Sequence, residues 1–131
     1  MSRFSTLRLA DAAAATAPDG ADVRVLLDLA AGGMARFELA AGQTAAAVTH
    51  RSVEEIWFVL SGRGEIWRRQ GAREEVVALE PGVCVSIPLG TDFQFRAAPD
   101  AGVAVIAITM PPWPGASEAV PVAGPWQPGA A

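Results

Sequence analysis

The residues whose types suit proton-transfer chemistry lie close together, in residues 42–62. This stretch contains the only histidine of the chain, His50, and two adjacent carboxylates, Glu54 and Glu55. An almost entirely apolar run, residues 56–60, follows them directly. A histidine and a carboxylate that are buried together can hold a proton near neutral pH and pass it to a bound molecule. This stretch is therefore the candidate site, and the rest of the chain must position it.

Composition and charge exclude several classes of protein. The chain has 131 residues, a length typical of one domain. Its ten basic residues are all arginines, they are mostly scattered, and the net charge is −4, so the basic surface of a nucleic-acid-binding protein is missing. The single cysteine, Cys84, cannot form an intramolecular disulfide. No apolar run approaches the roughly 18 residues of a membrane span. We expect a soluble, cytoplasmic protein with no nucleic-acid or membrane partner.

The middle of the chain has the pattern of short strands separated by turns. Apolar and polar residues alternate in segments such as 35–39, and glycine or proline bounds each segment. No segment between residues 22 and 110 keeps a helical period. About nine short strands at roughly ten-residue spacing predict an all-β sandwich or barrel. The expected strands are 23–27, 35–39, 44–50, 55–60, 65–69, 74–79, 83–87, 92–97 and 103–110.

The two ends of the chain differ from this pattern. We expect a single domain over residues 1–131, with an N-terminal arm over 1–21, a barrel over about 22–110 and a Pro-rich tail over 111–131. Proline lacks the N–H group that a sheet requires, so the tail is expected to stay outside the sheets. Its tryptophans need apolar cover, on the outside of the barrel, over its mouth or on a neighbouring subunit. These tryptophans are Trp113 and Trp126.

Two stretches of the sequence resemble the two motifs of the cupin superfamily. The first family motif is G-x5-H-x-H-x3,4-E-x6-G, and it aligns with residues 42–62. The second is G-x5-P-x-G-x2-H-x3-N, and it aligns with residues 82–97. The resemblance implies an antiparallel, jelly-roll-like cupin β-barrel over about residues 22–110.

The resemblance also implies a metal site, which this sequence keeps only in part. Cupins typically hold a divalent metal ion with three histidines and one glutamate, and only His50 and Glu55 remain of that set. Val48 and Phe93 stand where two histidines are expected. Zn, Fe, Mn or Ni sites usually need more than two protein donors, so we expect no tightly bound metal. If a metal is present, Asp92 is a third candidate ligand, although strand alternation directs it away from the site.

The resemblance implies that Glu55 faces the interior of the barrel, whereas Glu54 alternates outward. Burial among apolar side chains would raise the pKa of Glu55, and a protonated His50 would lower it. Phe95 is expected to fill the barrel, while residues 94 and 96 face the opposite side. The expected ligand-binding residues are Val48, Trp57, Glu65, Trp67 and Phe93.

Three functions are compatible with these residues. The sequence favours a small-molecule enzyme of cupin type, an isomerase, lyase or cyclase, in which His50 and Glu55 act as acid and base. A non-catalytic cupin that binds or senses a small ligand is one alternative, and a purely structural His50–Glu55 pair remains open with it. A metal-dependent cupin, such as a dioxygenase or a sugar isomerase, is another, with Asp92 or Glu65 as its third donor.

The strand over residues 55–60 is apolar on both faces. If Trp57 and Val59 face the interior, then Ile56, Phe58 and Leu60 form an outward apolar patch. Monomers seldom leave such a patch uncovered. The arm, the tail or a second subunit could cover it. Because cupin-like proteins commonly dimerise, we expect a homodimer.

Overall fold

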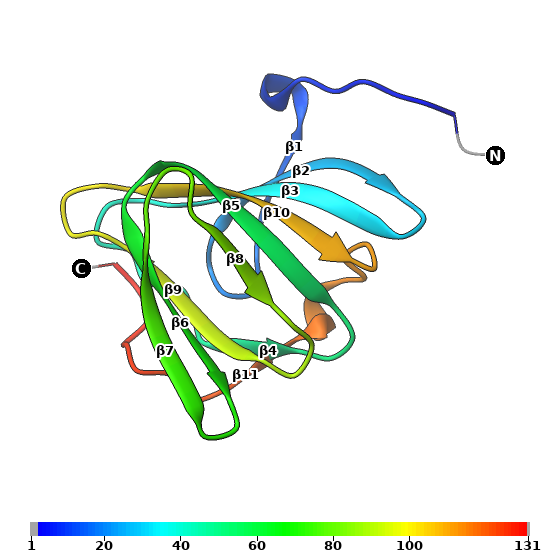
Figure 1. Ribbon diagram of the computed structural model, residues 1–131. Helices are drawn as coiled ribbons and strands as arrows, with labels where there is room; N and C mark the ends of the chain where they lie inside the picture. Colours follow the sequence, from blue (N-terminus) through cyan, green and yellow to red (C-terminus); the bar gives the residue numbers. More distant parts are fainter. Residues whose placement is uncertain (1–2, 131) are drawn as a thin grey trace.

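Two antiparallel β-sheets pack face to face in the computed structural model, which describes residues 3–130 (Figure 1). The six-stranded sheet has the order β1-β2-β3-β10-β5-β8, and the five-stranded sheet has the order β11-β4-β9-β6-β7. The strands are β1 Ala13–Thr16, β2 Asp22–Leu29, β3 Gly32–Leu39, β4 Val48–His50, β5 Glu54–Gly62, β6 Gly64–Gln70, β7 Arg73–Leu79, β8 Cys84–Ile87, β9 Asp92–Ala97, β10 Val103–Met110 and β11 Ala119–Pro121. Two short 3-10 turns, η1 Leu9–Asp11 and η2 Ala116–Glu118, complete the elements. The predicted all-β class is confirmed.

The core lies between the two sheets and follows the alternation of the strands. Along β5, Glu55, Trp57 and Val59 are buried. The residues between them point to the outside, as the sequence predicts. Phe93 and Phe95 of β9 meet this face from the opposite sheet, and the ring centroids of Trp57 and Phe95 are 4.8 Å apart. Strand alternation therefore brings Glu55 into an aromatic interior.

Both ends of the chain contribute strands, which the sequence did not predict. Residues 13–16 form β1 and pair with β2, and residues 119–121 form β11 and pair with β4. The expectation that the tail stays outside the sheets is wrong for β11. The strand tolerates Pro121 because this residue is the last of an edge strand, where a missing N–H costs little.

The second half of the tail packs on the outer face of the five-stranded sheet. The side-chain amide of buried Gln94 donates to the carbonyls of Ala45 and Trp126, both at 2.9 Å. The Trp126 N–H donates back to Gln94 Oε1 at 3.1 Å. The Arg96 guanidinium lies 4.0 Å from the centroid of the Trp126 ring. These contacts hold the tail against β9.

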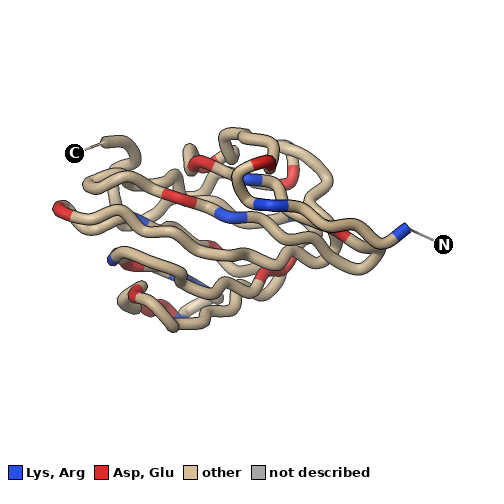
Figure 2. The backbone as a smooth tube through the Cα atoms, turned by 90° about the horizontal axis from the view of Figure 1, so that it is seen from above, with Lys and Arg blue, Asp and Glu red and all other residues tan. Residues whose placement is uncertain are grey.

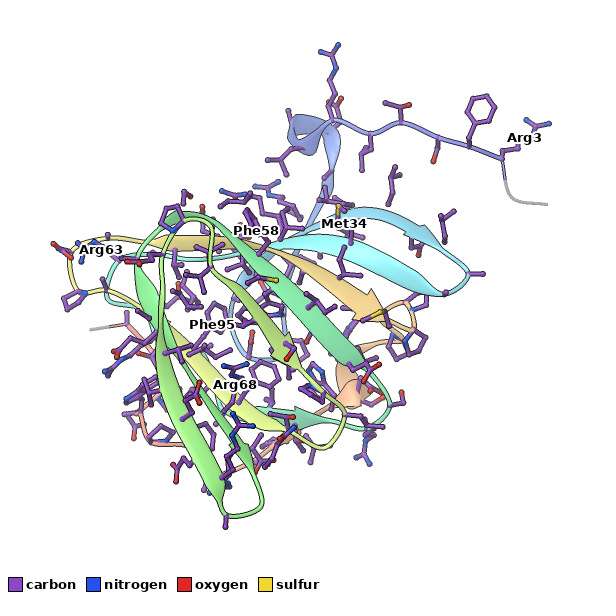
Figure 3. The ribbon with its side chains drawn as sticks, viewed as in Figure 1. Arg3, Met34, Phe58, Arg63, Arg68 and Phe95 are labelled. Carbon is purple, nitrogen blue, oxygen red and sulfur yellow. The ribbon has the colours of Figure 1, made fainter. Side chains whose placement is uncertain are left out.

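An apolar patch remains on the outer face of the six-stranded sheet. Ile56, Phe58 and Leu60 of β5 are 45%, 48% and 44% exposed, and Met34 of β3 is 40% exposed. Phe58 and Met34 are labelled in Figure 3. The homodimer expected from this patch stays a prediction.

Charged residues are spread over both sheets and do not form a single-sign surface. Basic and acidic positions are interspersed along the backbone of both sheets (Figure 2). Within the described residues, no helix has the length and apolar character needed to cross a membrane.

Gly62, which ends β5 before the hairpin to β6, has a backbone φ of 81°. A Cβ added there would overlap the carbonyl oxygen of Gly102. Gly82 has a similar φ of 91° but open space around it. We therefore expect Gly62→Ala to lower the free energy of unfolding by roughly 3 kcal/mol or more, and Gly82→Ala by about 1 kcal/mol. Urea denaturation of both variants measures the two costs, and equal losses would contradict this account of the hairpin.

Candidate functional site

A mostly apolar cavity of about 370 Å³ opens between the two sheets. Its wall is built from β1, β2, β3, β4, β5, β9, β10 and β11, together with the β1–β2 turn and the start of the tail. The aromatic residues of the wall are Phe37, Trp57, Phe93 and Trp113. The polar residues of the wall are Thr16, Asp19, Asp28, His50, Glu55 and Thr109.

His50 and Glu55 face each other across the wall of the cavity. His50 ends β4 in one sheet, and Glu55 lies near the start of β5 in the other, so the pair bridges the two sheets. His50 Nδ1 lies 3.3 Å from Glu55 Oε2, and the two side chains are only 6% and 2% exposed. The contact is poorly aligned, and within the described chain Nδ1 has no hydrogen-bond partner. The predicted pair is therefore assembled, with a ring nitrogen left available.

Burial sets the protonation of Glu55. Removal from water raises the pKa of Glu55 from 4.5 to about 7. The Trp57 indole N–H donates to Glu55 Oε1 at 3.3 Å and acts in the opposite direction. The negative charge of Asp19 raises the pKa further. Near neutral pH, Glu55 is therefore present in both its protonated and its ionised form.

The surroundings of His50 favour the neutral imidazole. Its ring meets the rings of Phe93 and Trp113 edge to face, with centroids 5.2 Å and 5.1 Å away. Burial lowers the pKa of His50, although the charge of Glu118 and the Val53 carbonyl oppose this shift. A neutral imidazole beside a half-protonated carboxyl group gives the pair one proton to transfer.

Glu118 holds the loop that joins the two halves of the pair, and the sequence analysis missed it. Its carboxylate accepts from the N–H groups of Ser52 and Val53, the latter at 2.6 Å, and from Ser52 Oγ at 3.0 Å. Burial raises the pKa of Glu118, but these hydrogen bonds and His50 outweigh it and lower the pKa overall. The only signal in the sequence is that Glu118 is the sole charged residue after Asp100.

Asp19 is a second cavity residue that the sequence analysis missed. It lies in the turn between β1 and β2, where its Oδ1 accepts the Ala21 N–H at 3.0 Å. Its carbonyl accepts the Ala46 N–H at 2.8 Å, which fixes the turn against the loop before β4. Burial raises the pKa of Asp19 to about 6, against the opposing effect of backbone hydrogen bonds. The Pro-Asp-Gly sequence here predicts a turn, and nothing local shows that the turn borders a cavity.

The structure separates the predicted ligand-binding residues into two groups. Val48, Trp57 and Phe93 line the cavity. Glu65 and Trp67, which were also expected to bind the ligand, do not line the cavity, although Trp67 is buried with 1% exposure. Trp67 donates its N–H to Glu74 at 2.6 Å, and Glu65 accepts from Arg96 at 2.8 Å.

The cross-strand register explains why these two side chains do not line the cavity. Trp67 pairs with Gln94, and Glu65 pairs with Arg96, so each shares a face with a residue that already points outward. Ile66, between them, occupies the inward position. Asp92 also points away from the cavity and forms an ion pair with Arg69 at 2.8 Å.

The residues at the family's metal position do not fit a metal site. Val48 and Phe93, which are cross-strand partners, bring apolar side chains to the same wall as His50 and Glu55. No group of three or more His, Cys, Asp or Glu side chains suited to a metal ion occurs within residues 3–130. Two donors are too few for the Zn, Fe, Mn or Ni sites considered above.

The family of the chain follows from its sequence and its fold together. Residues 35–109 match the family model of the cupin domain. The chain therefore belongs to the cupins, and its two-sheet architecture is a cupin β-barrel. Comparison with curated proteins gives no match.

Solved structures share this fold at low sequence identity. An oxalate decarboxylase variant from Bacillus subtilis is similar over 93% of this chain and 34% of its own, with 12% identity and a TM-score of 0.76. A variant of PAC13 from Streptomyces with uridine is similar over 93% and 92%, with 14% identity and a TM-score of 0.70. A cupin protein from Bacteroides fragilis is similar over 84% and 86%, with 24% identity and a TM-score of 0.65.

The raised pKa of Glu55 predicts a particular pH dependence of stability. Between the unfolded value of 4.5 and the folded value of about 7, the folded state binds more protons. The contribution of Glu55 to the free energy of unfolding therefore falls as pH rises through this window. Glu55→Gln should remove this loss, so the variant gains up to roughly 3 kcal/mol on the wild type between pH 4.5 and pH 8.

Urea denaturation across this pH range measures the difference between the two proteins. His50, whose pKa is lowered, gives the opposite slope below pH 6.5 and is present in both. Glu54→Gln, at the exposed neighbouring position, is the control and should parallel the wild type. A constant difference between Glu55→Gln and the wild type would contradict the assignment.

The missing donors predict that a metal site can be rebuilt. Val48→His combined with Phe93→His would place two imidazoles beside His50 and Glu55 and restore the family's donor set. We expect this double variant to bind Zn²⁺ or Mn²⁺ at least about 100-fold more tightly than the wild type, because it has four donors instead of two. Isothermal titration calorimetry gives both affinities. Equal affinities would show that the wild-type residues already suffice.

Proposed function

We propose that this protein is a small-molecule enzyme of cupin type, an isomerase, lyase or cyclase, that works without a tightly bound metal. His50 and Glu55 exchange a proton with the substrate. The observation that carries this proposal is the His50–Glu55 pair itself, which is almost fully buried, borders a cavity and contains a ring nitrogen without a partner. A pair that served only packing would be expected to satisfy that nitrogen.

The protonation states of Glu55 and His50 indicate which group acts as the base. Because the pKa of Glu55 is about 7, its ionised form can accept a proton from a C–H group next to a carbonyl. The protonated carboxyl then returns that proton to another atom of the substrate, which gives isomerisation with no net change in protons. Neutral His50, 3.3 Å from Glu55, can take up the proton between the two steps.

The aromatic wall supports this chemistry by keeping water away. Trp57 fixes the Glu55 carboxyl through its N–H, and Trp113 covers the His50 ring from the tail. Burial in this apolar wall raises the pKa of Glu55 to about 7 and would protect a reactive enolate from side reactions.

The similar structures agree with an enzymatic role only at the level of the fold. One is an oxalate decarboxylase, and PAC13 is described with uridine, so proteins with this fold include an enzyme and a protein that accommodates a small molecule. Function depends on the site rather than the fold, and the proposal therefore depends on His50 and Glu55.

Proton exchange at carbon provides a test that does not require the natural substrate. The protein is incubated in D₂O with a panel of small ketones and aldehydes, and deuterium incorporation next to the carbonyl is followed by NMR. We expect the wild type to accelerate exchange for at least one compound, and Glu55→Gln and His50→Ala to lose at least about 100-fold of that rate.

Glu54→Gln is the control variant and should retain the wild-type rate, because its side chain is exposed outside the cavity. Circular dichroism verifies that all variants are folded. Full activity of Glu55→Gln would exclude the proposed base, and a wild type without exchange on the whole panel would favour the non-catalytic binding alternative.

A further inference from the structure

The charged residues of the cavity are all of one sign. The wall contains three carboxylates, Asp19, Asp28 and Glu55, and one histidine whose pKa is lowered. None of the ten arginines, all of which lie in the described residues, borders the cavity, and the chain has no lysine. We propose that this cavity selects a small organic cation, a protonated amine carried on an apolar body.

This inference rests on the proposed function only in taking the cavity as the substrate site. It adds the chemical class of the substrate. The inference also excludes phosphates and carboxylates as ligands. An anion in this cavity would meet negatively charged side chains and no cationic partner.

The pairing of the other acids strengthens the argument. Elsewhere in residues 3–130, six acidic side chains form ion pairs with arginines. The acids in these pairs are Asp22, Glu38, Glu65, Glu75, Asp92 and Asp100. Asp19 and Asp28 belong to none of these pairs, and Glu55 meets only His50. Asp19, Asp28 and Glu55, the three carboxylates that border the cavity, therefore have no arginine partner.

The positions of Asp19 and Glu55 fit the protonated amine of such a ligand. Asp19 and Glu55 come from different parts of the chain, the β1–β2 turn and β5, yet the charge of Asp19 acts on Glu55. Asp19 is also held in place by the Ala21 N–H at 3.0 Å. Two fixed carboxylates on one wall repel each other when ionised, and a cation between them would relieve that repulsion.

The aromatic remainder of the wall fits the apolar body of such an amine. Phe37, Trp57, Phe93 and Trp113 present aromatic rings to the cavity. Aromatic faces attract cations and also provide apolar surface for the body of the ligand. A wall of aromatic rings with a few carboxylates is thus suited to an amine, and less suited to a polyhydroxylated sugar.

A matched series of probes tests the inference. Each apolar body, phenyl, cyclohexyl or indole, is used with three end groups: an ethylamine, an ethanol and a propanoate. Isothermal titration calorimetry at pH 7.5 measures the affinity of the wild type for each. We expect at least one amine to bind at least ~10-fold more tightly than its alcohol, and no propanoate to bind detectably.

Two variants locate the origin of the preference. Asp19→Asn should reduce the affinity for the amine at least ~5-fold and leave the alcohol unchanged, because only the charged end meets this side chain. Asp22→Asn is the matched control, since Asp22 is exposed, pairs with Arg24 and does not border the cavity. Asp28→Asn, at an exposed strand position, keeps the test available if Asp19→Asn does not fold.

The outcomes separate this inference from the proposed function. Alcohols or propanoates that bind as tightly as the amines, amines that fail to bind throughout the series, or an unchanged preference in the Asp19→Asn and Asp28→Asn variants would overturn it. Deuterium exchange of neutral ketones together with such results would leave the enzymatic proposal standing. Amine binding by a protein without any exchange activity would instead contradict the enzymatic proposal alone.

Discussion

A carboxyl group and an imidazole, Glu55 and His50, are almost fully buried beside each other, and this contact depends on the packing of the two sheets. His50 belongs to one sheet and Glu55 to the other, so their 3.3 Å contact exists only when both sheets are packed. Neither group is stabilised as an ion by burial, since the pKa of Glu55 is raised and that of His50 is lowered. Packing of the barrel thus creates the proton chemistry of the site.

The tail is part of this site rather than an appendage. Ionised Glu118 satisfies the N–H groups of Ser52 and Val53, which lie in the loop between β4 and β5. A buried donor without an acceptor costs about 1–3 kcal/mol, so this loop depends on Glu118, which lies 66 and 65 positions further along the chain than Ser52 and Val53. Trp113 covers His50 from the same segment. The Pro-rich sequence therefore lines the cavity and positions the pair at the same time.

The sequence predicted the parts of the site that depend on local alternation and on the cupin motifs. It distinguished inward Glu55 from outward Glu54, because the resemblance to the first cupin motif places its glutamate at position 55 and neighbouring side chains of a strand point to opposite faces. It failed for Glu65 and Trp67, whose direction depends on which residues of β9 they pair with. Asp19 and Glu118 were missed for a related reason. A turn and a tail carry no periodic pattern, and their place beside the cavity is decided by long-range packing.

The loss of the metal-binding histidines leaves the negative charge of the cavity acids without a metal ion to offset it. In the family's usual site a divalent cation would offset the glutamate, but Val48 and Phe93 remove the histidines that hold such an ion. The negative charge must then be reduced by a proton, by an arginine or by a ligand. No arginine borders the described cavity. Burial raises the pKa values of Asp19 and Glu55 and so favours their protonated forms, and a bound cation would replace those protons. Proton transfer and cation binding would therefore draw on the same two carboxylates.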